Sequence, residues 1–398
     1  MIPINQKMLA LGEKSSVIRE VFEYGNRRRA EIGAENVFDF SLGNPSVPSP
    51  DIVNAALKDM LDGDAVSVHG YTSAAGDMNT RRAVAEYLCK THGATLGAEN
   101  IYMTCGAAAS LTATLNAICR VGDEVVAFAP FFPEYRVFVE KAGATLVSVP
   151  CRESDMQIDT KALEAAISGK TKAVIINSPN NPTGVVYPEK TIREIAGILK
   201  KRSAENGAPI YIVSDEPYRE LVYDEHIKVP FIPNYYDETI VCYSFSKSLS
   251  VPGERIGYVA VSDKCTEWKR LFAAVCGAGR SLGFVCAPSI FQKIIPECLG
   301  KTSDISVYKK NRDILYSALV EYGYKVIHPD GAFYIFFKSP DESAEAFCEK
   351  AKKYELLLVP SDSFQASGYI RIAYCVGTDM ITRSLPAFEA LAKEYGLK

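Results

Sequence analysis

Between about residues 100 and 262 the chain repeats one pattern, in which a short apolar run is followed by a stretch of helical character. The runs have the length of strands and are apolar throughout, as expected of strands that are buried on both faces. Strands that alternate with helices predict a largely parallel α/β sheet with helices on both sides. The predicted strands are 125–128, 145–149, 173–176, 211–213, 240–242 and 258–261, and predicted helices between them include 110–119 and 189–200.

The character of the sequence changes near residue 290 and then predicts a smaller α+β domain. The N-terminal segment precedes the large domain and needs a packing partner, so we expect it to join this second domain. We therefore predict a large domain over residues 46–289 and a small domain built from residues 1–45 and 290–398. The elements expected outside the large sheet are helices over 13–35, 51–61, 288–321, 341–354 and 379–396, and strands over 38–42, 332–338 and 369–374.

Composition excludes several classes of function. A chain of 398 residues with a net charge of -4 is long enough for two domains and carries no basic excess for nucleic acid or a membrane surface. The 11 cysteines form no CxxC pair, and the 4 histidines are dispersed, so we expect reduced thiols and no metal site. Residues 1–7 carry no signal-peptide core, and no stretch reaches membrane-spanning length, so we expect a cytoplasmic protein.

Polar residues follow three of the predicted strands at the point where each strand ends. Ligands of open α/β sheets collect at the carboxyl ends of the strands, so the loops at 177–184, 214–218 and 243–248, with 252–255, can meet at one edge. Alone, a lysine is mostly a surface charge, an aspartate after a strand is often a helix cap, and an NPTG stretch can be a turn. Together, the loops offer the groups needed to hold a phosphorylated ring with a basic nitrogen and an aldehyde, which is pyridoxal phosphate.

The stretches at 180–184 (NNPTG), 215–218 (DEPY) and 244–247 (SFSK), with Arg255, resemble class I/II aminotransferases of the aspartate aminotransferase family. The resemblance covers essentially the whole chain. It implies pyridoxal-phosphate fold type I, in which a large domain with a mostly parallel seven-stranded sheet is joined to a smaller α+β domain. It also implies pyridoxal 5′-phosphate as the cofactor.

The resemblance assigns roles to the residues at this edge. Lys247 corresponds to the lysine that holds the cofactor as a Schiff base and later moves a proton between the substrate and the cofactor. Asp215 would face the pyridine nitrogen and keep the ring protonated, which stabilises negative charge at the substrate's α-carbon. Tyr218 and Asn181 would bind the phenolic oxygen of the ring.

The phosphate of the cofactor has its own expected ligands. The turn at 104–110 resembles the glycine-rich phosphate turn of the family, and Gly106, Ala107 and Ala108 would donate backbone N–H groups at the start of a helix. Many relatives carry more glycine or a polar side chain where this chain has alanine, and an ordinary alanine-rich helix start is the alternative. The remaining expected phosphate ligands are Ser244, Ser246 and Arg255.

Four further positions are assigned by the same resemblance. Phe132 would stack on the cofactor ring, although a core phenylalanine is the alternative. Tyr71 resembles the tyrosine that reaches the phosphate of the neighbouring subunit, which implies a homodimer with shared active sites. Arg371 lies in an apolar strand and would bind the substrate α-carboxylate, unless it faces solvent or pairs internally. Gly43 would bring a backbone N–H to the same carboxylate.

The expected reaction is ping-pong transamination from an L-amino acid, such as aspartate or a related amino acid, to a 2-oxo acid such as 2-oxoglutarate. Arg280 falls near the position where dicarboxylate-specific relatives carry an arginine, so it would bind the substrate side chain, or else it is a surface charge or a dimer contact. The main rival is a carbon–sulfur β-lyase on the same fold, which can share every cofactor contact. A non-enzymatic regulator would need a DNA-binding module, and the segment before Gly43 leaves no room for one. A nicotinamide enzyme would need a GxGxxG turn after its first strand, which the chain lacks.

Overall fold

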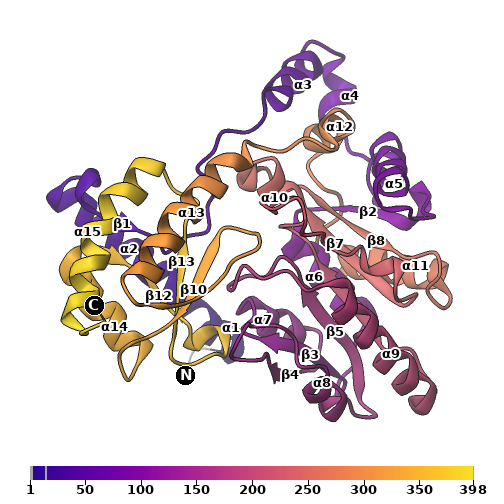
Figure 1. The fold of residues 1–398 in the computed structure, drawn as a ribbon. Coiled ribbons are helices and arrows are strands. Elements are labelled where there is room, and N and C mark those ends of the chain that lie inside the picture. The colour runs from indigo at the N-terminus through magenta and orange to yellow at the C-terminus, as the bar shows by residue number, and fades with distance from the viewer. Residues whose placement is uncertain (1–2, 14–15, 398) are drawn as a thin grey trace. The chain divides into compact units, whose positions relative to one another are not determined.

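The computed structural model describes residues 3–13 and 16–397, which form two compact units (Figure 1). Unit 1 comprises Met1–Asn44, Val307–Pro329 and Phe333–Lys398. Unit 2 comprises Pro45–Ser306 and Asp330–Ala332. Each unit has its own sheet, and the two are described separately below.

Unit 2 is built on a seven-stranded sheet in the order β2-β8-β7-β6-β5-β3-β4. All its strands run parallel except β8, which is antiparallel to both β2 and β7. The predicted fold class is therefore confirmed, and each of the six predicted strands is present. The short strand β2 was not predicted from the sequence. The strands are β2 (Ile101–Thr104), β3 (Glu124–Ala129), β4 (Thr145–Pro150), β5 (Thr171–Asn177), β6 (Tyr211–Asp215), β7 (Thr239–Ser244) and β8 (Gly257–Val261).

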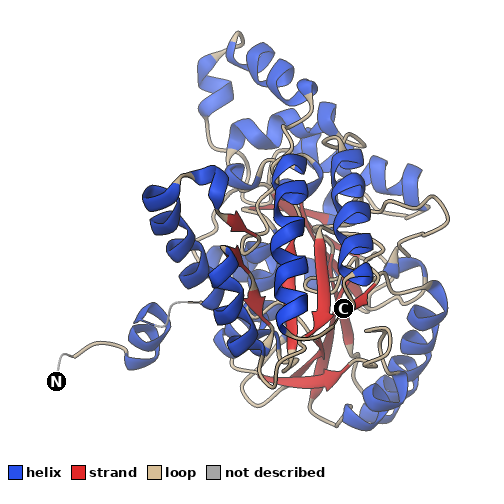
Figure 2. Ribbon diagram, turned by 60° about the vertical axis from the view of Figure 1, so that its left-hand side comes forward, coloured by secondary structure: helices blue, strands red, loops and turns tan. Residues whose placement is uncertain are grey.

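Helices cover both faces of this sheet (Figure 2), because successive strand residues point to opposite sides and are apolar on both. Tyr102 and Cys242 belong to a core cluster shared with α6, α7 and α11, whereas Met103 and Val241 belong to one shared with α3, α5 and α12. The helices of unit 2 are α3 (Asp51–Leu61), α4 (Ala65–His69), α5 (Met78–His92), α6 (Ala107–Ile118), α7 (Glu134–Lys141), α8 (Thr160–Ala166), α9 (Glu189–Asn206), α10 (Phe245–Ser248), α11 (Trp268–Ser281) and α12 (Ser289–Cys298).

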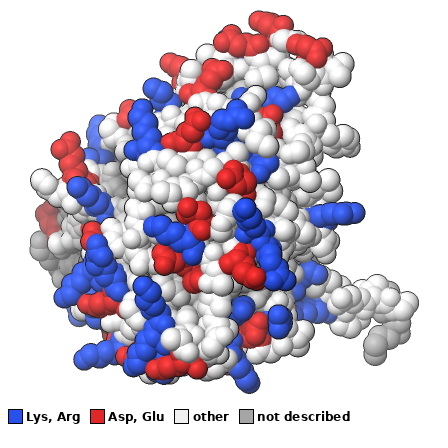
Figure 3. Space-filling view, turned by 90° about the vertical axis from the view of Figure 1, so that its right-hand side faces the viewer, with Lys and Arg blue, Asp and Glu red and all other residues white. Residues whose placement is uncertain are grey.

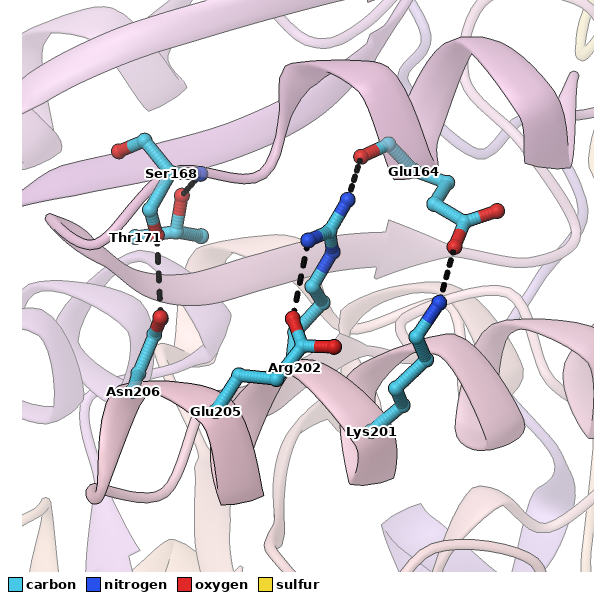
Figure 4. A network of polar contacts seen from close by, with 7 residues as sticks. All are labelled: Glu164, Ser168, Thr171, Lys201, Arg202, Glu205 and Asn206. Carbon is cyan, nitrogen blue, oxygen red and sulfur yellow. Dashed lines mark hydrogen bonds and ion pairs between the residues drawn. The ribbon is translucent and has the colours of Figure 1, made fainter.

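A polar network on the outside of unit 2 ties α8 to α9 (Figure 4). Arg202 binds the Glu205 carboxylate at 2.9 Å and the carbonyl oxygen of Glu164 at 3.2 Å. Asn206 donates to the carbonyl oxygen of Ser168 at 3.1 Å, just before β5. Exposed pairs of this kind contribute at most about 1 kcal/mol each. Figure 3 shows basic and acidic side chains interspersed over one face of the molecule, without a continuous field of either sign.

Unit 1 is an α+β unit with a four-stranded antiparallel sheet in the order β12-β13-β10-β9 and a separate parallel pair, β1 and β11. Its N-terminal helix is shorter than the predicted 13–35, and residues 14 and 15 of that range lie outside the described part of the chain. The predicted strand over 38–42 is reduced to β1. The elements are α1 (Gln6–Glu13), α2 (Val17–Ile32), β1 (Phe38–Asp39), α13 (Ile305–Glu321), β9 (Lys325–Ile327), β10 (Tyr334–Lys338), α14 (Ala344–Ala351), β11 (Leu356–Leu357), β12 (Val359–Pro360), β13 (Tyr369–Ala373) and α15 (Thr378–Glu394).

The helical stretch predicted over 288–321 is two helices, α12 and α13, separated by residues 299–304. The first of them clusters with unit 2, whereas the sequence pattern assigned everything after residue 289 to the small domain. The reason is its apolar face, on which Ile294, Ile295 and Cys298 are buried together with side chains of α3 and α5. The unit boundary therefore falls at Ser306 and not at residue 289.

Candidate active site

The polar loops of unit 2 meet at one edge of the seven-stranded sheet because of its strand order. The parallel strands β2, β5, β6 and β7 all end there, and the antiparallel β8 begins there. In the register, Thr104 and Ser244 lie on either side of Gly257, and Asn177 lies opposite Asp215. This edge carries Lys247, Asp215, Asn181 and the expected phosphate turn.

Asp215 is a buried carboxylate at the end of β6, with one oxygen held and the other unsatisfied. Its Oδ2 accepts a 2.5 Å hydrogen bond from the Tyr135 hydroxyl and a longer one, 3.4 Å, from the Asn177 amide. Its Oδ1 is buried and has no hydrogen-bond partner in the described structure. Burial raises the pKa of the carboxyl to about 7, although the Tyr135 hydrogen bond opposes the shift. A buried, unsatisfied carboxylate oxygen is costly unless a ligand supplies a donor.

Asn181 lies in the loop after β5 and is tied to the same strand end. Its backbone N–H donates to the Asn177 side chain at 2.7 Å, so Asn177 connects this loop to Asp215. The Asn181 amide oxygen is buried without a hydrogen-bond partner among the described residues. Tyr218, three residues beyond Asp215, is also buried. These side chains therefore add an amide and a phenol to the same edge.

The expected phosphate ligands converge at the ends of β2 and β7. Gly106 caps the start of α6 with φ 85°, and a Cβ built there would lie 3.1 Å from the nearer Arg255 guanidinium nitrogen. The Ser244 and Ser246 hydroxyls lie 2.8 Å apart. A Cβ on Gly257 would lie 3.0 Å from the Gly106 Cα and 3.2 Å from the Ser244 Cα. A helix start, two hydroxyls and a guanidinium in one place are the kinds of donor that a phosphate dianion needs.

Two backbone features shape this expected phosphate site. Ala107 and Ala108 are the first residues of α6, whose four N-terminal N–H groups have no carbonyl partner within the helix. Arg255 has a left-handed backbone, φ 51°, and its guanidinium donates to the Pro252 carbonyl oxygen at 3.0 Å. Its side chain is exposed.

Lys247 lies in the short helix α10, which begins at the end of β7. The helix is capped by Ser244, whose hydroxyl accepts a hydrogen bond from the Ser246 backbone N–H at 3.2 Å. Lys247 is only partly buried. The same cap therefore places both the lysine and the two hydroxyls.

Arg371 lies in unit 1, in the middle strand pair of the antiparallel sheet. It is buried, donates to the Ser41 carbonyl oxygen, and has its guanidinium 5.0 Å from the Tyr334 ring and 5.1 Å from the Phe364 ring. The two rings fix the plane of the guanidinium. Gly43 packs against the Tyr334 hydroxyl so closely that any Cβ there would overlap it. The glycine therefore has a packing role in unit 1 whatever else its N–H binds.

Three further predicted residues have distinct settings. Phe132 is half-buried, and its ring meets that of Tyr135 edge-on at 5.8 Å, so it lies beside the tyrosine that binds Asp215. Tyr71 is 96% exposed. Arg280 is exposed at the end of α11, and its side chain has no hydrogen bond or ion pair with any residue in the described part of the chain.

Tyr135 and Asn177 were missed in the sequence. Both lie at the edge of motifs that were recognised, since Tyr135 ends the aromatic stretch 130–135 and Asn177 lies three residues before the NNPTG stretch at 180–184. Nothing in the sequence indicates that either side chain turns toward Asp215.

The structure also bears on metal binding and membrane insertion. No group of three or more His, Cys, Asp or Glu side chains in residues 3–13 and 16–397 could hold a metal ion. None of the described helices is long and apolar enough to cross a lipid bilayer.

The mostly parallel seven-stranded sheet, with a lysine, a buried carboxylate and a cluster of anion-binding donors at one edge, is typical of fold type I proteins. The sequence profile described as "Aminotransferase class I and II" matches residues 35–386. The chain belongs to this family of pyridoxal-phosphate-dependent enzymes and is an aminotransferase.

Individual relatives agree with this assignment. A crystal structure of an amino transferase from Eubacterium rectale is 55% identical, covers 99% of this chain and 100% of its own, and superposes with a TM-score of 0.97. The aspartate aminotransferase from Thermus thermophilus is 25% identical, with a TM-score of 0.86 over 98% of this chain and 100% of its own. A probable N-acetyl-LL-diaminopimelate aminotransferase from Bacillus subtilis is 31% identical over 385 residues, 93% of each chain. These relatives support transamination and do not favour the β-lyase alternative.

Proposed function

We propose that the protein uses pyridoxal 5′-phosphate, bound at the carboxyl edge of the seven-stranded sheet, to move an amino group from an L-amino acid to a 2-oxo acid. Aspartate or a related amino acid is the proposed donor, and 2-oxoglutarate the proposed acceptor, in a ping-pong sequence. Relatives named aspartate aminotransferase, from Thermotoga maritima and Pyrococcus horikoshii, support this donor class. The observation that carries the proposal is the buried Asp215 oxygen without a partner, in the same sheet edge as the cluster of anion-binding donors.

When bound, pyridoxal phosphate supplies an aldehyde carbon that accepts the amino nitrogen and a ring that withdraws electrons from the substrate's α-carbon. The Asp215 Oδ1, buried without a partner among the described residues, would accept a hydrogen bond from the ring nitrogen, and its burial would strengthen that interaction. Lys247 would hold the aldehyde through its amine, and its Nζ is the group that would move the α-proton of the substrate. Tyr218 and Asn181 donate to the phenolic oxygen of the ring. Phe132 packs on the face of the ring.

The phosphate group is held by neutral and cationic donors. Ser244 and Ser246 donate their hydroxyls, and Arg255 donates its planar guanidinium fork. The backbone N–H groups of Gly106, Ala107 and Ala108 donate from the start of α6, where the helix dipole favours an anion. This turn has alanine where many relatives carry a polar side chain, but the backbone donors do not depend on that side chain.

The substrate is oriented by its carboxylates. Arg371 binds the α-carboxylate through two parallel N–H bonds, and the Gly43 backbone N–H adds a third donor. Fixing this carboxylate aligns the α-C–H bond for removal by Lys247, which favours deprotonation over loss of carbon dioxide. Arg280 binds the second carboxylate of a dicarboxylic substrate. Its exposure, without a partner in its own described chain, is compatible with reaching a site in a second copy.

We also propose that the enzyme works as a homodimer in the cytoplasm. Tyr71 is almost fully exposed on a single chain, as expected of a side chain that completes the site of a second copy. All 11 cysteines are free in the structure, which suits a reducing compartment. Its partners are then small amino acids and 2-oxo acids.

Trapping the cofactor on its lysine tests this function. The protein is incubated with pyridoxal phosphate, reduced with borohydride and mapped by peptide mass spectrometry, with Lys247→Ala as the control. We expect the label on Lys247 and, in single-turnover spectra, conversion of the bound cofactor by aspartate or a related donor. A label confined to other lysines would refute the assignment, and release of pyruvate and ammonia in place of the aminated cofactor would indicate a lyase.

A further inference from the structure

Gln292 is a fully buried amide in α12 that joins two loops of unit 2. Its exposed fraction is 0%. Its Oε1 accepts a hydrogen bond from the Asp77 backbone N–H at 2.7 Å, and its Nε2 donates to the Thr72 hydroxyl at 3.2 Å. The same Nε2 donates to the Ala287 carbonyl oxygen at 2.7 Å. One side chain thus clamps the loop before α5 to the loop that follows α11.

The loop before α5 is held by several hydrogen bonds. The Ser73 hydroxyl donates to the Gly76 carbonyl oxygen at 2.5 Å, and the Gly76 N–H donates back to the Ser73 carbonyl oxygen at 2.8 Å. Met103 of β2 donates to the Ala75 carbonyl oxygen at 3.0 Å. Gly76 has φ +109°, and a Cβ there would lie 2.9 Å from the Gln292 Oε1. Clamp and loop are therefore packed against each other.

This loop presents one aromatic side chain to solvent. Tyr71 directly precedes Thr72, the residue that Gln292 holds, and is 96% exposed. A hydrogen bond also joins the neighbouring helices α12 and α4 (Figure 1), since the Ser289 hydroxyl donates to the Val68 carbonyl oxygen at 2.9 Å. Exposed tyrosines on loosely held loops are ordinary, but a loop held by these hydrogen bonds presents its tyrosine from a defined backbone position. Such preorganisation benefits a side chain that must meet a partner group.

We propose that Gln292 is a positioning residue that presents Tyr71 to the cofactor phosphate bound by a second copy of the chain. The inference rests on the proposed function, in which Tyr71 completes the partner's site. The clamp acts through Thr72, because fixing that residue fixes the backbone from which Tyr71 projects. Gln292 itself touches neither substrate nor cofactor. Its loss therefore weakens the site of the partner and leaves the site of its own chain intact.

Mixed dimers with one functional lysine separate these two sites. Two differently tagged chains are co-expressed and the heterodimer is purified, with Lys247→Ala on one chain so that only the other chain binds the cofactor productively. Gln292→Met, which keeps the side-chain volume and removes the polar groups, is placed on the same chain as Lys247→Ala or on the opposite chain. The dissociation constant of pyridoxal phosphate is measured for the single remaining site, together with kcat and KM.

The two arrangements have opposite expected results. With both substitutions on one chain, the functional lysine faces the altered loop, and we expect about tenfold weaker cofactor binding. With Gln292→Met on the chain that keeps Lys247, we expect the same cofactor affinity as in a dimer of one Lys247→Ala chain and one wild-type chain. If Gln292 had only a structural role, cofactor binding would weaken in the chain that carries the substitution and not in its partner. That result would overturn the proposal. Gln157→Met, which removes an amide bound to the Val186 carbonyl oxygen, is the matched control and should affect neither arrangement.

Tyr71→Phe in the same two arrangements distinguishes failure of the inference from failure of the proposed function. If Tyr71→Phe shows no effect across the dimer, the shared site itself is wrong. If Tyr71→Phe acts across the dimer and Gln292→Met does not, only the clamp is wrong. Should Gln292→Met fail to fold, Thr72→Val removes the hydroxyl that accepts the 3.2 Å bond from Gln292, together with the exposed bond of that hydroxyl to the Ser73 carbonyl oxygen. We then expect about threefold weaker cofactor binding in the arrangement across the dimer. Unchanged binding in Thr72→Val would likewise refute the clamp.

Discussion

The buried carboxyl of Asp215 should make the cofactor-free protein lose stability as the pH rises. Its pKa is about 7 in the folded chain, against 3.8 for an aspartate side chain in water, because burial disfavours the charged form. The folded state therefore binds a proton that the unfolded state has already released between these two values. Linkage then lowers the free energy of unfolding as the pH rises through that window, and the loss is complete above pH 7.

Asp215→Asn isolates the size of this effect, because an amide cannot ionise. Two pH units separate pH 5 from the folded pKa, so at 1.36 kcal/mol per unit the wild type loses about 2.5 kcal/mol between pH 5 and pH 8 from this residue alone. The amide that the substitution introduces replaces an oxygen without a hydrogen-bond partner, and any cost of burying that amide is the same at both pH values.

Urea unfolding of the cofactor-free protein measures the prediction. Free energies of unfolding are compared at pH 5 and pH 8 for the wild type, Asp215→Asn and the exposed control Asp59→Asn. We expect the wild type and the control to lose about 2.5 kcal/mol more than Asp215→Asn over this range, while Asp215→Asn abolishes transamination. Equal pH dependence in all three proteins would refute the reasoning, because it would mean that the carboxyl is not neutral in the folded state at pH 5.

Three further outcomes follow from the geometry. Tyr135→Phe removes the 2.5 Å hydrogen bond to Asp215, worth about 1.5–3 kcal/mol, so the pH at which unfolding stability levels off should rise by about 1–2 units in the same assay. Arg255→Gln should weaken pyridoxal phosphate binding by about 10–100-fold in an equilibrium titration, since a charge-assisted fork is lost, and unaltered binding would contradict the proposed phosphate site. Arg371→Lys should raise the KM for the amino donor by about tenfold or more in steady-state kinetics, because an ammonium cannot make two parallel bonds to a carboxylate.

Much of the fold was predictable because a buried strand appears in the sequence as a short apolar run. Five of the six longer strands of the large sheet are buried along almost their whole length, and such strands need apolar side chains on both faces; they are β3, β5, β6, β7 and β8. The edge strand β4 has both buried and exposed residues. The strand β2 was missed because four residues between a turn and a helix are too few to show a period. The unit boundary was missed because α12 and α13 are both helical, and only packing on α3 and α5 assigns the first of them to the large unit.

The sequence by itself determined the chemistry at the sheet edge. The lysine, aspartate and NPTG stretches lie directly after apolar strands, and parallel strands bring their carboxyl ends together whatever their order. Only the tertiary structure decided which distant side chains contact those groups. Because β8 is inserted between β2 and β7, Arg255 meets Gly106, and because β5 adjoins β6, Asn177 reaches Asp215. Strand order is set by long-range packing, which cannot be predicted from any single stretch of residues.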